Sequence, residues 1–365
     1  MCDNQKINHF PQSYELTRKD RLCYNVVQMQ DKFGKDEFNI IPDTYILPDE
    51  FADFYSHFHK LKAKEVQNNQ WIIKPQNSSQ GKGIYIIDDI SEVPIDEQCI
   101  VSKYITNPLL INGLKFDLRV YVLITSFDPW RIYVYDEGLA RFASEPYQSP
   151  SPDAKNGPGE SVGKNNKFAH LTNYSINKKN DKYVQNANAD QDDTGHKWSL
   201  AAFNKHLETV LGVDTHLMWA KIYDVILKSL LSVDSVVFQN LKKLPNRNNC
   251  FELLGYDILI DSELKPWLME VNLSPSLATD SPLDVKIKSN LLVDTFNLVG
   301  IRKFDRRRDS LTKMKNRVKN IMRAKSYQSR QPNPQSQAGA NNPVAIGNTK
   351  ITGQPNQAAP LQIFQ

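Results

Sequence analysis

The sequence has few cysteines and no long apolar run, and each shortage excludes a class of protein. Its four cysteines are scattered without the spacing of a zinc site or a disulfide framework. No stretch approaches the roughly 18 apolar residues that a membrane-spanning helix needs. Asp3 and Asn4 precede any apolar segment, unlike the start of a signal peptide. We therefore expect a soluble intracellular protein that binds no membrane.

The charge of the chain is unevenly distributed. The 365 residues have an ordinary globular composition, with 40% hydrophobic and 24% charged residues, and are enough for two or three subdomains. The net charge is only +4, yet residues 302–365 carry thirteen lysines and arginines against two aspartates, a net of +11. About −7 therefore remains for the rest of the chain. A mildly acidic body with a basic tail suggests an anionic polymer as partner.

An acidic hairpin is predicted near the end of the globular part. Two short apolar strands, 255–260 and 267–271, flank a polar turn. Because strand side chains alternate, Glu270 and Asn272 share a face, and a tight hairpin places Asp257 opposite Glu270. Two carboxylates and an amide oxygen suit Mg²⁺, which shares its coordination with substrate phosphates. Alternatively, the carboxylates form structural ion pairs with nearby lysines or arginines.

A glycine-containing loop between predicted strands 71–75 and 84–87 is a candidate phosphate site. Its small residues leave backbone N–H groups free to surround phosphate oxygens, and Lys74 and Lys82 supply positive charge. It is neither a Walker loop nor a Rossmann fingerprint, because no helix follows it. The alternative is a flexible hairpin without a ligand.

A third feature is a strand that carries alternating charges. Lys115, Asp117 and Arg119 are two residues apart and lead into the apolar run 120–124. All three can therefore face one side of a sheet. Three charges on one face of a Val/Leu/Tyr-rich strand do not suit a purely structural sheet.

The remaining pattern predicts helices, one long loop and a polar tail. Apolar residues at helical spacing indicate helices over residues 14–33, 49–67, 197–211, 215–232 and 285–298. A Pro, Gly, Ser and Asn-rich segment, 144–166, predicts a mobile surface loop.

Beyond Gly300 the pattern changes to a basic helix. Residues 302–325 place Leu311, Met314, Val318 and Ile321 on one apolar stripe. The last forty residues, 326–365, are rich in Gln, Asn, Pro and Ala, which predicts disorder.

Taken together, the loop, the charged strand and the acidic hairpin are what an ATP-grasp ligase needs to bind a nucleotide and a metal. The motifs WIIKPQNSSQGKGI, KFDLRVYV, EGLARFA, HLTNYSINK and CFELLGYDILIDSELKPWLMEVNLSPSL resemble, in this order, those of the tubulin–tyrosine-ligase-like family. INHFPQSYELTRKDRL and DSPLDVKIK are most similar to its polyglutamylase branch. The resemblance extends from about residue 7 to residue 301.

The resemblance implies an α+β ATP-grasp fold with two β-rich lobes and the nucleotide between them. Relatives usually carry a longer N-terminal lobe before the INHFP-like stretch, so we expect a shortened one here. The expected organisation is an N-terminal lobe over 1–70, a central lobe over 71–165, a C-terminal lobe with the metal hairpin over 166–301, a basic helix over 302–325 and a disordered tail over 326–365.

The resemblance also implies an ATP-dependent tubulin polyglutamylase. ATP would phosphorylate the γ-carboxyl of a glutamate in a tubulin tail, and the amine of free L-glutamate would displace phosphate to form an isopeptide bond. The implied partners are tubulin and microtubules, with no nucleic acid. The implied location is the cytoplasm and cytoskeleton, including microtubules of cilia or basal bodies.

Carried over by motif, the resemblance assigns roles to individual residues. The residues expected to bind ATP are Lys74, Gln80, Gly81, Ser102, Lys103, Tyr104, Ile105, Lys115, Phe116, Asp117, Thr172 and Asn173. The residues expected to bind the incoming amino acid are Arg141, Tyr174, Ser175, Lys197 and Lys288. Asp257, Glu270 and Asn272 would bind Mg²⁺, and Arg119 and Glu270 would be catalytic. Gln80 stands where several polyglutamylases have arginine, which weakens the expectation that this position grips the acidic acceptor.

Alternatives remain open at this stage. A glycine ligase would share the ATP machinery, and a catalytically silent relative would only bind microtubules. The segment 302–325 resembles in character the cationic modules with which some family members contact the microtubule surface. A solvated basic tail is the alternative to such a contact.

Overall fold

The computed structural model describes residues 5–64, 69–76, 81–149, 166–244, 246–301 and 305–328. Contacts divide the chain into two units, Met1–Ile301 and Arg302–Gln365. Within the described ranges, no helix is both long and apolar enough to cross a membrane. Most of the predicted loop 144–166 and nearly all of the predicted tail 326–365 lie outside these ranges.

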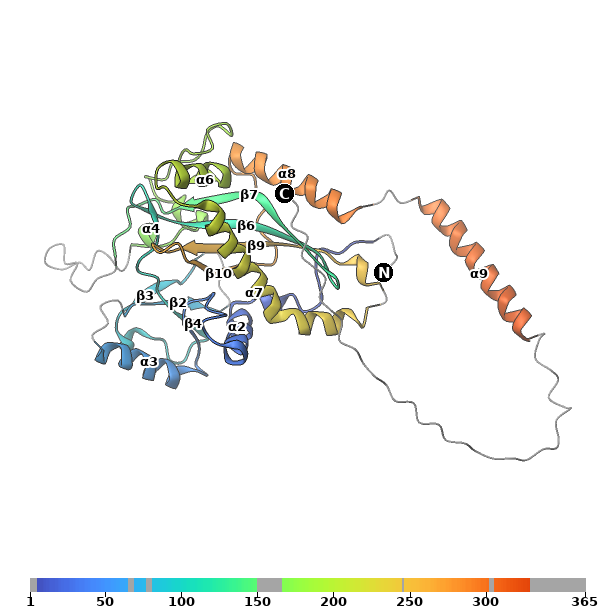
Figure 1. Cartoon of the computed structure of the whole chain (residues 1–365), viewed down its shortest axis with the longest axis horizontal. Coiled ribbons are helices and arrows are strands. Elements are labelled where there is room, and N and C mark those ends of the chain that lie inside the picture. The colour runs from blue at the N-terminus through green and yellow to red at the C-terminus, as the bar shows by residue number, and fades with distance from the viewer. Residues whose placement is uncertain are drawn as a thin grey trace, which may run out of the picture. The chain divides into compact units, whose positions relative to one another are not determined.

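The first unit contains helices and two antiparallel sheets, an α+β architecture (Figure 1). The smaller sheet has the order β1-β4-β2-β3. Its strands are β1 (Thr44–Leu47), β2 (Trp71–Pro75), β3 (Tyr85–Ile87) and β4 (Cys99–Lys103). Helix α3 (Phe51–Ala63) packs on one face through Phe54 and Phe58 against Trp71 and Ile73. Because side chains alternate along β2, Ile72 faces the other way, into a cluster with Tyr104 and Leu171.

The larger sheet has the order β10-β9-β6-β7-β8, with a short strand β5 paired to β6. Its strands are β5 (Leu110–Ile111), β6 (Leu114–Phe127), β7 (Trp130–Phe142), β8 (Lys197–Ser199), β9 (Glu252–Ile260) and β10 (Pro266–Asn272). Helices cover both of its faces. Helices α6 (Leu200–Thr209) and α7 (Thr215–Leu241) cover one face, and α8 (Pro282–Val299) covers the other. The short helical elements of the first unit are α4 (Lys167–His170), α5 (Tyr174–Asn177), η1 (Ile90–Glu92) and η2 (Arg247–Asn249).

Alternation along β6 separates the core from the charged face. Its even-numbered residues, from Phe116 to Ile124, join the main core beneath α6 and α7. Among the odd-numbered residues, Tyr121 and Leu123 pack with α8. Lys115, Asp117 and Arg119 alternate with the core residues in the same way. One strand therefore anchors the sheet and presents charged groups at the same time.

The N-terminal region is divided between the two sheets. Helices α1 (Tyr14–Thr17) and α2 (Lys19–Phe33) place Leu16, Leu22 and Val26 in the core of the larger sheet. Ile7 forms a parallel bridge with Cys250 at the start of β9. Residues from β1 and α3 instead belong to the smaller sheet. The described residues of 1–70 thus share their cores with both sheets.

Several predicted helices have different bounds in the structure. The predicted helix 197–211 begins as strand β8, because Lys197 to Ser199 pair with β7, and Ser199 then caps α6 by accepting a hydrogen bond from the Ala202 N–H. The predicted helix 49–67 is α3, which starts two residues later, at Phe51, after Glu50. Helix α7 extends to Leu241, nine residues beyond the predicted end, because apolar residues such as Val233 and Val237 continue its buried face.

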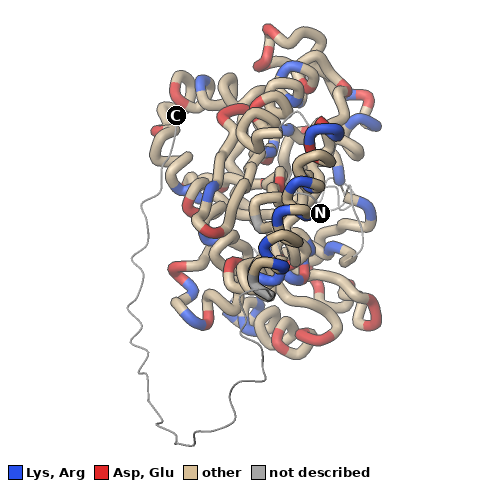
Figure 2. Tube along the Cα trace, turned by 90° about the vertical axis from the view of Figure 1, so that its right-hand side faces the viewer, with Lys and Arg blue, Asp and Glu red and all other residues tan. Residues whose placement is uncertain are grey.

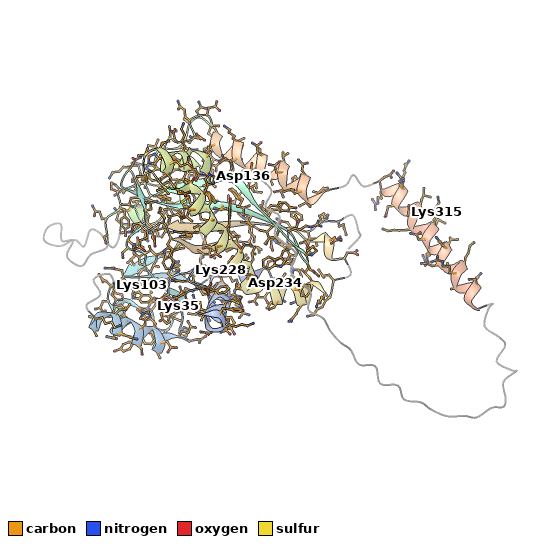
Figure 3. All side chains as sticks on the ribbon, viewed as in Figure 1. Lys35, Lys103, Asp136, Lys228, Asp234 and Lys315 are labelled. Atoms are coloured by element: carbon orange, nitrogen blue, oxygen red, sulfur yellow. The ribbon has the colours of Figure 1, made fainter. Side chains whose placement is uncertain are left out.

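The second unit contains helix α9 (Arg306–Gln328). The segment 302–325 was expected to be a basic helix, and α9 carries nine lysines and arginines against one aspartate (Figure 2). The predicted stripe is exposed, with exposed fractions from 44% at Val318 to 66% at Met314. Lys315, labelled in Figure 3, lines a surface groove of this helix together with Leu311, Met314 and Val318. Within its own unit the apolar stripe of α9 is therefore accessible.

Candidate active site

A cavity lies between the two sheets and collects residues from distant parts of the chain. Its lining combines four lysines, three acids, several polar groups and apolar walls. The lining residues are Lys19, Lys74, Lys103, Lys115, Asp117, Asp257, Glu270, Gly81, Tyr104, His170, Thr172, Asn173, Ile72, Ile84, Ile105, Leu171, Leu259 and Met269. The apolar walls can hold a planar ring, and the lysines can hold an anion.

Three of the cavity lysines have no carboxylate partner within the described part of the chain. Among the described residues, no acidic oxygen lies within 4.0 Å of the amines of Lys74, Lys103 (labelled in Figure 3) or Lys115. The Lys115 amine instead donates a hydrogen bond of 3.0 Å to the Tyr104 hydroxyl, whose oxygen lies 2.9 Å from Nδ1 of His170. Burial lowers the pKa of Lys115 to about 7 and that of Lys103 to about 8. An anionic ligand would restore their charged forms.

The arginines of the site, by contrast, are fully paired. Asp257 accepts hydrogen bonds of 2.6 and 3.1 Å from Arg119 and lies 2.8 Å from Arg141. Arg141 also donates two bonds, of 2.7 and 2.6 Å, to Asp117. Burial would raise the pKa of Asp257, but the two arginines outweigh it and hold this pKa well below the usual range. The network follows from strand register, since Arg119 pairs with Asp257 and Asp117 with Arg141 across β6, β9 and β7.

A glycine lets this network form. Gly255 lies opposite Tyr121 on β6, next to the Arg119 side chain. A Cβ at position 255 would lie 2.8 Å from the Pro275 Cβ and 3.2 Å from the Arg119 Cδ. A larger residue would therefore collide with Pro275 and press on the Arg119 side chain.

The acidic hairpin has the predicted register. Glu270 pairs with Asp257, and the Asn272 amide donates a 3.2 Å hydrogen bond to the Glu270 carboxylate. Lys19 of α2 lies 3.2 Å from the other Glu270 oxygen. In the described part of the chain there is no cluster of three or more His, Cys, Asp or Glu side chains able to hold a metal. The alternative of protein ion pairs is thus realised for both carboxylates, while Asp257 and Glu270 remain register partners in the hairpin.

The predicted amino-acid residues form a separate cluster. Lys197 and Lys288 share the carboxylate of Asp284, at 2.7 and 2.8 Å. The Lys197 amine also lies 4.2 Å from the centre of the Tyr174 ring. Ser175 follows Tyr174 on α5. Arg141 is not paired with this cluster, because Asp117 and Asp257 hold its guanidinium group.

Other predicted residues are placed differently from expectation. The Phe116 side chain is fully buried in the core against Phe142 and Phe203. It therefore cannot contact a molecule in the cavity, because strand alternation turns it away from its neighbours Lys115 and Asp117. The Ser102 hydroxyl accepts a 3.1 Å bond from Thr44 and lines a smaller adjacent cavity. Gln80 lies outside the described residues.

Two polar residues of the cavity were missed by sequence reasoning. Lys19 sits in the LTRKD segment, which carried the resemblance without a role for its lysine. His170 opens the HLTNYS motif and is buried. A signal existed for His170, because Thr172 and Asn173 beside it were predicted to bind the nucleotide. Nothing in the sequence indicated that Lys19 meets Glu270, 251 residues away.

Comparisons with known proteins agree on one family. The family model of the tubulin-tyrosine ligase family matches residues 1–308. The chain is 46% identical over 301 residues to tubulin polyglutamylase TTLL5 of Mus musculus. This alignment covers 82% of the present chain and 21% of the mouse protein. It is 42% identical over 312 residues to tubulin polyglutamylase ttll-5 of Caenorhabditis elegans, covering 83% and 41% respectively. It is 40% identical over 341 residues to tubulin polyglutamylase ttll6 of Danio rerio, covering 92% and 41%.

These relatives are much longer than the aligned region, and the chain spans between about a fifth and two fifths of their lengths. The family match covers both sheets, the cavity between them and the acidic hairpin. The chain belongs to the tubulin-tyrosine ligase family.

Proposed function

We propose that this chain is an ATP-dependent ligase that adds glutamate to the γ-carboxyl of glutamates in acidic tubulin tails. The observation that carries the proposal is the cavity with three lysines, one buried and two partly buried, that lack a carboxylate partner among the described residues. Its chemistry fits a nucleotide, whose base is apolar and planar and whose phosphates are anionic. The names of the relatives support tubulin as the substrate.

The proposed nucleotide site follows the ATP-grasp arrangement, with ATP between the two sheets. The base would lie between Ile72, Leu171 and Met269, and the phosphates near Lys74 and the backbone of Gly81. Lys19 is a further candidate for the phosphates, because it lines the same cavity.

The donor set also fits a magnesium ion. Asp257, Glu270 and Asn272 offer only oxygen ligands in adjacent register positions. Bound there, Mg²⁺ would offset the charge of the terminal phosphates. For Asp257 and Glu270 to take part, Arg119, Arg141 and Lys19 must loosen their contacts with these carboxylates, and phosphate oxygens are alternative partners for such cations.

The proposed reaction has two steps. The acceptor γ-carboxylate attacks the terminal phosphorus of ATP, which forms an acyl phosphate and releases ADP. The neutral α-amine of glutamate then attacks the acyl carbon, the amide bond forms, and phosphate leaves with its electron pair while the amine loses a proton. Arg119 would stabilise the charge on the transferring phosphoryl group. Lys197 and Lys288 would bind a carboxylate of the amino acid.

A product assay tests this proposal and its alternatives. The full chain is incubated with ATP, Mg²⁺, tubulin and labelled glutamate or glycine, and the tubulin tails are analysed by mass spectrometry. Added glutamates support the proposal. Added glycines would favour the glycine ligase. The absence of any Mg²⁺-dependent thermal shift with ATP would favour a silent microtubule-binding relative.

Helix α9 would provide a microtubule contact in this account. Its nine basic residues fit the acidic surface expected of tubulin, and such a contact weakens as salt rises. Cosedimentation with microtubules at increasing salt compares the full chain with a variant lacking residues 302–365. Equal affinity of the two proteins would indicate a solvated basic tail.

A further inference from the structure

One buried carboxylate, that of Asp284, holds two lysines that come from different elements. Lys197 on β8 donates a 2.7 Å hydrogen bond to its Oδ2 atom. Lys288, one turn further along α8, lies 2.8 Å from its Oδ1 atom. Asp284 has no exposed surface, and only 7% of each lysine side chain is exposed. The carboxylate therefore fixes two amines side by side at the end of the larger sheet.

The charge of this trio is unbalanced. Two lysines against one aspartate leave one positive charge. Burial by itself would raise the pKa of Asp284, but the hydrogen bonds and charges of Lys197 and Lys288 outweigh it and lower this pKa. Asp284 thus stays ionised, and the trio can accept one further anionic group. Asp280 is close enough to act on Lys197 electrostatically, but no Asp280 oxygen forms an ion pair with either lysine among the described residues.

A second observation indicates that a ligand with a hydrogen-bond acceptor binds near the trio. The Tyr183 ring packs against Tyr174 and stacks on His196, and its hydroxyl is buried with no hydrogen-bond partner in the described structure. Burial first, then Tyr174 and the negative charge of Asp284, raise the pKa of Tyr183. Its hydroxyl therefore remains a donor. Buried donors without partners are rare in folded proteins, so this one calls for an acceptor from elsewhere.

We propose that Asp284 is a positioning residue of the amino-acid site, which holds Lys197 and Lys288 so that together they bind a single carboxylate of the incoming amino acid. This inference rests on the proposed function and deepens it. The alternative is a purely structural role, in which Asp284 only stabilises the first turn of α8. Ser281 caps this helix by accepting a bond from the Asp284 N–H and donates its own hydroxyl proton to the Asp284 carboxylate.

Steady-state kinetics of the full chain tests the inference. Asp284→Asn, Lys197→Met and the double variant are compared with the wild type over a range of glutamate concentrations. We expect Asp284→Asn to raise the KM for glutamate about tenfold or more, with kcat within about threefold and ATP binding unchanged. Because Asp284 acts through Lys197, the double variant should raise KM by less than the product of the two single changes.

Ser281→Ala is the matched control, because it weakens the helix cap and leaves all three charged groups in place. Its KM for glutamate should stay within about twofold of the wild type. An unchanged KM in Asp284→Asn, a fully multiplicative double variant, or an equal effect of Ser281→Ala would overturn the inference. If Asp284→Asn does not fold, Lys197→Met is compared with the double variant, which leaves one unpaired lysine instead of the two of Asp284→Asn. An equal KM for glutamate in these two variants would then overturn the inference. A wild type that binds no ATP would instead overturn the proposed function.

Discussion

Two groups of cations at the site, the arginines of the larger sheet and the lysines that line the cavity, differ in their partners. Arg119 and Arg141 have their own acids, which fix their geometry. Lys74, Lys103 and Lys115 have no ionic partner in the described chain, and burial lowers the pKa of each. Breaking an arginine–aspartate pair should lower the free energy of unfolding. The unpaired lysines should lower it in the intact protein, because their amines are desolvated without an acid nearby. This difference is the reason for proposing that the lysines bind an anionic ligand.

Breaking the paired group has the largest expected effect. Asp257→Ala leaves Arg119 without its acid and Arg141 with Asp117 alone, which should lower the free energy of unfolding by about 3–5 kcal/mol. Denaturant unfolding of the full chain measures this change. A loss below about 1 kcal/mol would mean that the arginine network contributes little to the fold.

Removing the other carboxylate of the hairpin should separate catalysis from folding. Glu270→Gln keeps the shape of a partly exposed side chain and its contact with Asn272. We expect ligation to fall at least about a hundredfold, as for loss of a charge-stabilising group, while the melting temperature stays within a few degrees. Full ligation activity in this variant would refute the proposed metal site.

Removing an unpaired lysine should change the free energy of unfolding in the opposite direction to Asp257→Ala. Lys115→Met deletes a buried amine without an acid partner, so the free energy of unfolding should stay the same or increase. Its affinity for ATP should fall about tenfold or more, because charge-assisted bonds to phosphate are lost. Thermal unfolding with and without ATP measures both effects. A strongly destabilised variant would show that the comparison is wrong.

The pKa of Lys115 predicts how ATP affinity depends on pH. This amine has a pKa of about 7 in the folded chain against 10.5 ordinarily, so above pH 7 the unfolded chain binds a proton that the folded chain does not. Its contribution therefore makes the ligand-free fold more stable as pH rises from about 7 to 10.5, and this gain is lost as pH falls through 7. Phosphate binding favours the charged amine, so ATP affinity should weaken between pH 7 and 9. Lys115→Met should show a flatter profile.

The smallest effect is expected for the lysine that is shared between the two groups. Lys19 has Glu270 as a partner yet lines the cavity. Lys19→Met should weaken ATP binding about fivefold, within the range of one exposed charge contact. Lys32→Met, on the exposed face of the same helix, is the control and should leave ATP binding unchanged.

Local patterns were predictable from the sequence, but distant partners were not. The hairpin register, with Asp257 opposite Glu270, follows from the strand period and is confirmed. The same alternation of strand side chains also predicts that the Phe116 side chain points into the core, away from the cavity. The contacts of Lys19 with Glu270 and of Asp284 with Lys197 join residues 251 and 87 positions apart. Such pairs depend on how sheets and helices pack against one another. The alternation of side chains along one strand gives no information about this packing.

Titration calorimetry of ATP into the full chain in the presence of Mg²⁺, at pH 8 in two buffers of different ionisation heat, tests the central claim most directly. The cavity with its three unpaired lysines predicts saturable binding accompanied by proton uptake, with the uptake reduced in Lys115→Met. A folded chain that takes up no ATP, or that binds it with the same heat in both buffers, would contradict the account.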